Sequence, residues 1–144
     1  MRSVRGSSKA WNAALCKKRK TFSPMKCYVR RNEKLSELGY AGYVEYLKSQ
    51  DWQRIRDRKL QRYPDCLLCQ KRANQVHHLS YDFPTLLGIK HWRLVQLCSD
   101  CHKSIEFDGE RKRPLKGANA VLFRLAAMTE RGRRWAKSMS ERGR

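Results

Sequence analysis

The stretch CLLCQKRANQVHHLSY (residues 66–81) decides the fold, because it joins a pair of cysteines to a pair of histidines. Cys66 and Cys69 are separated by two residues, and the same spacing returns at Cys98 and Cys101 after 28 intervening residues. Two residues between thiolates let one tight turn offer both sulfurs to a single ion, and two such turns complete a tetrahedron. The spacing therefore predicts a closed structural zinc site.

Other interpretations of the four cysteines fit the sequence less well. A redox dithiol is typically found in a thioredoxin-like βαβ pattern, which this sequence does not resemble, and iron–sulfur clusters usually require other spacings. No apolar stretch near Met1 is typical of a secretory signal. We therefore expect an intracellular, cytoplasmic protein, in which thiols stay reduced and paired cysteines bind metal more often than they form disulfides.

The charge of the chain indicates a polyanionic partner. Its 144 residues include 33 Lys plus Arg against 13 Asp plus Glu, which gives a net charge of +20. A field of this strength favours nucleic acid, with an anionic membrane surface as the second candidate. The mean hydropathy is −0.82, and no run approaches the roughly 18 apolar residues of a spanning helix. We therefore expect no membrane partner, and the sequence identifies no protein partner.

The charges also divide the chain into three predicted parts. Residues 1–32 hold ten Lys or Arg and no acid, which predicts a basic N-terminal arm that is largely disordered when free. An organellar transit peptide is a second interpretation of this segment, but its amphipathic pattern is poor. Residues 33–110 are predicted to form the folded domain. Residues 111–144 are basic again, with a predicted helix at ANAVLFRLAAM (residues 118–128) and a loose tail from Gly132.

Hydrophobic periodicity predicts an α+β domain. Short apolar runs at NQVHHL (residues 74–79) and RLVQL (residues 93–97) are typical of strands, and SDCHKSIEF (residues 99–107) is typical of the start of a helix. Further helices are predicted over residues 33–38 and 43–48, and from Ser49 or Asp51 to about Arg62, ahead of Pro64.

Three histidines accompany the predicted zinc site. His77 and His78 end the first predicted strand, and His102 directly follows Cys101. Because one zinc would tie both strands and the start of the helix together, we expect the three imidazoles to lie close in space. Adjacent side chains on a regular strand point to opposite faces. His77 and His78 therefore serve one site only if the strand twists or ends there.

This arrangement resembles the HNH nucleases, also called His-Me finger or ββα-metal nucleases. The resemblance runs from about Tyr46 to Asp108 and is carried by WQRIRDRKL, CLLC, QVHHLSY and LVQLCSDCHKSIEF. It implies a small ββα-metal finger with a four-cysteine zinc ribbon, preceded by helices and flanked by basic terminal extensions. It also implies metal-dependent hydrolysis of phosphodiester bonds, with double-stranded DNA as the expected substrate.

The resemblance further implies a role for each histidine. His77 maps to the first ligand of a catalytic divalent cation, His78 to the general base, and His102 to the second ligand. Glu106 lies one helical turn after His102 and is a further candidate ligand. Two imidazoles suit Zn²⁺, Ni²⁺ or Mn²⁺, whereas an added carboxylate such as Glu106 would suit Mg²⁺.

One position departs from the family pattern. Arg93 stands where the middle Asn of the motif is expected, and an arginine cannot accept hydrogen bonds. This departure favours an alternative function, a non-catalytic zinc-ribbon protein that binds nucleic acid and has a degenerate HNH site. The three retained histidines favour the nuclease. For either function we expect basic side chains to contact nucleic acid, namely Arg54, Arg56, Arg93 and Lys103.

Overall fold

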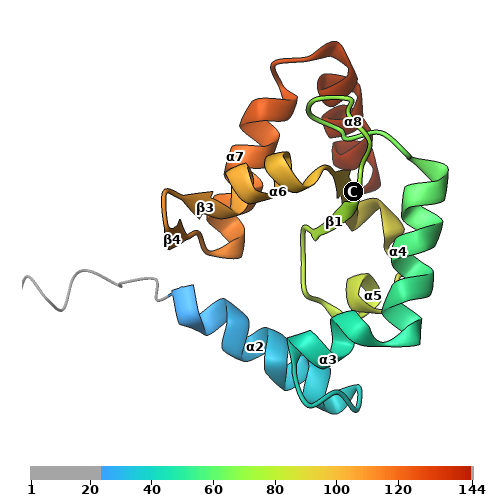
Figure 1. The fold of residues 1–144 in the computed structure, drawn as a ribbon, viewed down its shortest axis with the longest axis vertical. Helices are drawn as coiled ribbons and strands as arrows, with labels where there is room; N and C mark the ends of the chain where they lie inside the picture. Colours follow the sequence, from blue (N-terminus) through green and yellow to red (C-terminus); the bar gives the residue numbers. More distant parts are fainter. Residues whose placement is uncertain (1–23, 144) are drawn as a thin grey trace, which may run out of the picture.

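The computed structural model describes residues 24–143, which form an α+β domain (Figure 1). Seven α-helices, one short 3-10 helix and two small antiparallel sheets make up these residues, so the predicted α+β class is confirmed. Elements of this kind are not specific to the HNH family. No helix within residues 24–143 combines the length and apolar character needed to cross a bilayer. In chain order the elements are α2 (Pro24–Glu37), α3 (Tyr43–Lys48), α4 (Gln50–Arg62), β1 (Gln75–His78), α5 (Phe83–Leu86), η1 (His91–Arg93), β2 (Leu94–Leu97), α6 (Ser99–Glu106), β3 (Phe107–Asp108), β4 (Arg111–Lys112), α7 (Leu115–Ala126) and α8 (Glu130–Arg142).

The centre of the domain is the antiparallel hairpin of β1 and β2, which the sequence predicted. In its register, His77 pairs with Val95 and His78 with Leu94. All four residues of β2 are buried, as are the last three residues of β1. Since neighbouring residues on a strand point to opposite faces, this burial means that both faces of the hairpin are covered.

Two hydrophobic clusters cover the two faces. The first is built on Val95 and Leu97 and includes residues of the cysteine knuckles, α6 and α7. The second is built on Val76 and Leu94 and includes residues of α2, α3 and α4. The cysteines therefore share one core with the C-terminal helices, whereas the N-terminal helices belong to the other.

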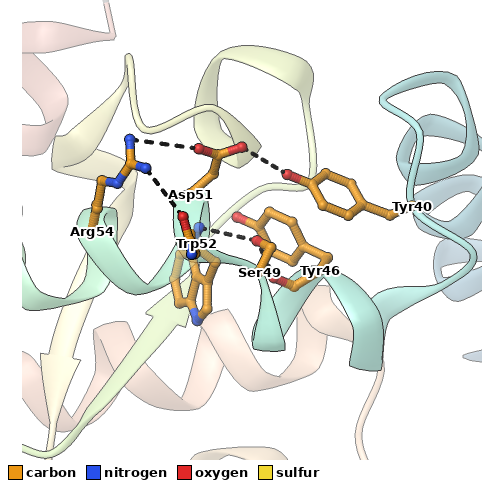
Figure 2. Close-up of polar contacts among 7 residues, drawn as sticks. Tyr40, Tyr46, Ser49, Asp51, Trp52 and Arg54 are labelled. Atoms are coloured by element: carbon orange, nitrogen blue, oxygen red, sulfur yellow. Dashed lines mark hydrogen bonds and ion pairs between the residues drawn. The ribbon is translucent and has the colours of Figure 1, made fainter.

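Helix α4 begins where the sequence predicted, at a side-chain cap. The Ser49 hydroxyl accepts a hydrogen bond from the Trp52 N–H at 3.2 Å, which satisfies one of the free N–H groups of the first turn. Figure 2 shows this junction, in which the Tyr40 hydroxyl donates to Asp51 at 3.3 Å and Asp51 lies 4.0 Å from Arg54. The first turn of α4 thereby holds Trp52 in the second core, where it is 3% exposed.

The N-terminal helix is longer than predicted. The sequence predicted a helix over residues 33–38 that follows a basic arm, but α2 begins at Pro24, a residue favoured in the first helical turn because it has no N–H to satisfy. Tyr28 of this helix donates a hydrogen bond to the Arg113 carbonyl at 2.9 Å, which ties α2 to the end of the domain. The predicted boundary at residue 33 is therefore too late, and residues 1–23 lie outside the described part of the chain.

The predicted C-terminal tail is a helix. Helix α7 confirms the helix predicted before it, but the chain then forms α8 instead of a loose segment from Gly132 onward. The Thr129 hydroxyl caps α8 by accepting from the Gly132 N–H at 3.0 Å. A Cβ atom on Gly132 would lie 2.0 Å from the Ala126 carbonyl oxygen. Glycine is needed here because α7 and α8 approach closely, and it does not mark the end of ordered structure.

Candidate metal centres

The four cysteines form the predicted cluster. Their sulfur atoms all lie within 4.8 Å of one another, and the sulfurs of Cys69 and Cys98 are 3.6 Å apart. Gln70 takes a φ of 64°, and its N–H donates to the Cys66 carbonyl at 3.0 Å, which closes the first knuckle. The second knuckle opens α6, where the Cys101 N–H donates to the Cys98 sulfur at 3.4 Å. This all-sulfur cluster fits a structural zinc site.

Cys98 is the thiol best prepared to bind as a thiolate. Burial by itself raises the pKa of this thiol, but the Cys101 N–H and the neighbouring thiols outweigh burial and lower the pKa to about 7. The free N–H groups at the start of α6 stabilise a negative charge at this position. Since metal ligation requires the deprotonated sulfur, the local structure favours cation binding here.

A second cluster of metal-ligand type lies between β1 and α6. His77, His102 and Glu106 each offer a ligand atom, and these atoms lie within 4.8 Å of one another. The centroids of the two imidazole rings are 5.5 Å apart, and Nε2 of His102 lies 3.5 Å from a carboxylate oxygen of Glu106. The predicted proximity of His77 and His102 is therefore confirmed. The predicted i,i+4 pairing of His102 with Glu106 is confirmed as well.

The second cluster is accessible from one side. The His102 and Glu106 side chains are each 22% exposed, whereas His77 is 3% exposed. Two imidazoles and one carboxylate match Zn²⁺, Mn²⁺ and Ni²⁺, and the carboxylate extends the set to Mg²⁺. A three-residue donor set leaves coordination positions for water or a ligand, which distinguishes it from the closed four-cysteine cluster.

Asn119 of α7 is a site residue that sequence reasoning missed. Its Oδ1 accepts from Nε2 of His77 at 2.9 Å, and its Nδ2 donates to the Leu79 carbonyl at 2.8 Å. With the proton on Nε2, the Nδ1 lone pair of His77 is left for a cation. Histidine ligands commonly donate their other ring N–H to an oxygen in this way. The available signal was a lone amide within the apolar run ANAVLFRLAAM.

Both imidazoles of the second cluster are neutral at pH 7. Burial lowers the pKa of His77 to about 4, although the hydrogen bond with Asn119 acts in the opposite direction. Burial, followed by the charge of Lys112, also lowers the pKa of His102. Neutral imidazole is the form that binds a metal ion, so the ligands pay no deprotonation cost at this pH.

His78 lies apart from this cluster, on the opposite face of β1. Its ring stacks on Trp52 with centroids 4.5 Å apart and planes at 26°. Its two nitrogens lie 3.4 Å from the hydroxyls of Tyr43 and Tyr46. The side chain is 2% exposed, and burial lowers its pKa to about 3. The prediction that all three imidazoles meet at one cation is therefore wrong for His78, because β1 stays regular through this residue.

Arg31 of α2 is a second residue that the sequence did not single out. Its guanidinium carbon lies 3.8, 4.9 and 5.3 Å from the ring centroids of Tyr43, Tyr28 and Tyr81. Arg31 is 9% exposed, and no carboxylate within residues 24–143 forms a salt bridge with it. The charges of both Arg31 and Glu106 act on the hydroxyls of Tyr81 and Tyr28, whereas Tyr43 and Tyr81 pack against the second core.

Arg93 supports the loop between the strands and is not a free surface cation. It pairs with Asp82 at 2.6 Å, and its carbonyl accepts from the Leu79 N–H at 2.8 Å. Asn119 holds the Leu79 carbonyl of the same loop. Arg93 and Asn119 together therefore fix the segment after His77.

The other predicted nucleic-acid contacts are divided between surface and structural positions. Arg54 is 71% exposed and Lys103 is exposed, so both are available to a phosphate. Arg56 instead donates to the Asn74 carbonyl at 2.8 Å and to Asp57 at 3.1 Å. Arg56 therefore ties α4 to the start of β1.

Comparison of the chain with family models, curated proteins and solved structures found no match. The four-cysteine cluster, with His77, His102 and Glu106 nearby, fits a zinc site. The comparisons do not name the HNH family. The function is therefore inferred from the geometry of the two clusters and from the charge of the chain.

Proposed function

We propose that the protein is a metal-dependent endonuclease of the HNH type that hydrolyses phosphodiester bonds in double-stranded DNA. The observation that carries the proposal is the cluster of His77, His102 and Glu106, beside a four-cysteine cluster on a hairpin and the helix that follows it. A net charge of +20 provides attraction for DNA along the whole chain.

The proposed site assigns a role to each polar residue around it. His77 and His102 hold the divalent cation through neutral imidazoles, and Glu106 adds a negatively charged oxygen. Asn119 fixes the tautomer and the ring orientation of His77. When bound, the cation would polarise the phosphodiester and lower the pKa of a coordinated water.

Arg31 is proposed to bind a phosphate oxygen at this site. A guanidinium can donate two parallel hydrogen bonds to a phosphate, and its planar face stacks on aromatic rings. The tyrosines around Arg31 provide that stacking. A buried cation without a carboxylate partner in the described chain gains free energy when an anion arrives, because burial weakens its hydration.

The proposal does not use His78 as the general base. Both nitrogens of His78 face tyrosine hydroxyls, and its ring is enclosed by aromatic side chains. A general base needs to lie within hydrogen-bond reach of the water it deprotonates. We infer instead that His78 packs the second core, and that water activation depends on the cation.

The second candidate function is a zinc-stabilised protein that binds nucleic acid without cleaving it. Two observations favour it: His78 is buried away from the His77 cluster, and Arg93 replaces the motif Asn. In that case a cation at His77 and His102 would only hold α6 against β1. The two functions predict the same DNA affinity but different chemistry.

A plasmid-nicking assay distinguishes the two functions. Supercoiled plasmid is incubated with the protein and Mg²⁺, Mn²⁺, Ni²⁺ or Zn²⁺ in turn, with EDTA as the control. The wild-type protein is expected to nick with at least one cation, and His102→Ala is expected to lower the rate at least a hundredfold. Ser104→Ala, two residues further along α6 at an exposed position, should retain most of the activity. DNA binding without nicking under every cation would support the binding protein, and equal nicking by His102→Ala would reject the proposed site.

A further inference from the structure

A hollow between α4, η1 and α8 combines aromatic and basic side chains. It has a volume of about 310 Å³. Its wall includes Lys59 of α4, Tyr63 at the C-terminal end of α4, Trp92 of η1, and Arg134 and Arg142 of α8. Lys59 of α4 and Arg142 near the C-terminal end of α8 both line it, so these parts of the two helices lie close together. None of the residues of the His77 cluster lines the hollow, so it is separate from the proposed site.

The charges of the hollow are all of one sign. Lys59, Arg131, Arg134 and Arg142 line it, and no Asp or Glu of residues 24–143 does. The hollow has an electrostatic cost in the free protein, because burial and the nearby charge of Arg142 lower the pKa of Lys59 to about 8. An anion placed among these side chains would remove that cost.

The aromatic rings of the hollow are partly exposed, and each has a cation or a second ring near one face. Tyr63 is 41% exposed, and Lys59 lies 4.4 Å from the centroid of its ring. Trp92 is half-buried and has Arg142 at 5.6 Å from its ring. Trp135 is held from behind by Phe123, with ring centroids 4.9 Å apart. Ring faces that already attract cations are also suitable for stacking a planar base.

An adjoining hollow of about 340 Å³ extends this surface. The two hollows share Lys59, Tyr63 and His91, and the second continues past the apolar side chains of Ile55 and Leu87. Leu87 is 50% exposed. Together they form a groove with basic and aromatic side chains at one end and, at the other, apolar side chains accompanied by Arg58 and Arg62.

From this groove we propose a second nucleic-acid site, specific for unpaired nucleotides. A base stacks on Tyr63 or Trp92, and the flanking phosphates contact Arg131, Arg134 and Arg142. In a duplex the faces of each base are covered by its stacked neighbours, so the ligand is a single-stranded segment or a frayed end. This site goes beyond the proposed nuclease, since it would capture a strand regardless of whether the His77 cluster cleaves one.

Fluorescence anisotropy with two labelled oligonucleotides tests the proposal. One is a twelve-residue oligo-dT, and the other is an abasic strand with the same number of phosphates. Both are titrated with the full chain at fixed salt and without added divalent cations. Stacking of at least one base predicts that oligo-dT binds five-fold or more tightly than the abasic strand. Equal affinity for the two strands would overturn the proposal.

Matched variants assign the preference to the groove. Tyr63→Leu is expected to remove most of the preference for oligo-dT, whereas Tyr63→Phe keeps the ring and should retain it. Arg142→Gln should weaken the binding of both strands more than Arg111→Gln does. Arg111 is an exposed arginine of β4, so its substitution makes the same change in charge away from the groove. A preference for oligo-dT that survives Tyr63→Leu and Trp92→Leu would overturn the site. The His102→Ala variant should bind both strands as the wild type does, which separates this test from the fate of the nuclease proposal.

Discussion

Asn119 offers the sharpest test of how the His77 cluster is built. In Asn119→Ala, the His77 N–H and the Leu79 carbonyl both lose their partner. An unpaired buried polar group costs about 1–3 kcal/mol, and alanine regains about 0.5 kcal/mol through its helix propensity. Water can replace the bond to the partly exposed Leu79, so we expect a net loss of about 2 kcal/mol in the free energy of unfolding.

The same substitution should weaken cation binding at the cluster. Without Asn119, the proton of His77 can move to Nδ1, which removes the lone pair that the hydrogen bond to Asn119 leaves for a cation. Loss of such a supporting hydrogen bond typically lowers metal affinity 10- to 100-fold. Calorimetric titration with Mn²⁺ measures this change on protein whose cysteine cluster is already loaded with zinc, and urea unfolding measures the stability.

A neighbouring position supplies the control for Asn119. Ala120 is exposed on the same helix, so Ala120→Asn reports the difference in helix propensity between the two residues without altering the site. The reasoning is refuted if Asn119→Ala loses no more stability than this control predicts and binds Mn²⁺ with unchanged affinity. The hydrogen bonds of Asn119 would then contribute nothing to the cluster.

Three further outcomes follow from the fold and the buried groups. Gly132→Ala should lower the free energy of unfolding by about 2–3 kcal/mol, measured in urea, because the added Cβ would meet the Ala126 carbonyl. Gly143→Ala is the control: its Cβ would lie 3.6 Å from the nearest atom, so its free energy of unfolding should stay within about 0.5 kcal/mol of wild type. The pKa values of His78 and His77 are lower in the folded than in the unfolded protein, so the unfolded chain binds the extra protons. Stability should be level above pH 7, and below pH 6.5 each of these histidines should contribute a fall of roughly 1.4 kcal/mol per pH unit. His78→Phe should remove the contribution of His78 while keeping plasmid nicking within ten-fold of wild type. A hundredfold loss of nicking in a folded His78→Phe protein would instead restore His78 as the base. Cys98→Ser should lower the zinc content and the thermal midpoint by roughly 10 °C or more, since the cluster joins the knuckle before β1 to the junction of β2 and α6.

Local signals in the sequence predicted those parts of the fold that depend on neighbouring residues. The Ser49 cap, the two strands and the helix that starts after Cys98 each follow from short-range patterns, and each is present. The four-cysteine cluster and the pair of His102 and Glu106 follow from spacing alone.

Contacts between distant segments could not be predicted in this way. Asn119 reaches His77 across 42 residues, and no local pattern distinguishes it from an ordinary helix amide. Gly132 is typical of a chain break in sequence, yet the close approach of α7 explains it. The two adjacent histidines could not be assigned from sequence for the same reason. Alternation along a strand predicts that His77 and His78 point to opposite faces unless the strand twists or ends there. Only the packing of His78 against Trp52 shows that β1 stays regular.

The alternation of His77 and His78 has a consequence for how such a chain can change its length. Each strand is four residues long. If β1 slipped by one residue against β2, the His77 ring would move to the side of Tyr43 and Tyr46, and the His78 ring would move to the side of α6. A one-residue insertion within β1 ahead of His77 would therefore exchange the two histidines, whereas insertions between Asp82 and Arg93 would leave their facing unchanged. Descendants of this chain should accordingly tolerate length variation in the segment between Asp82 and Arg93 and almost none within β1.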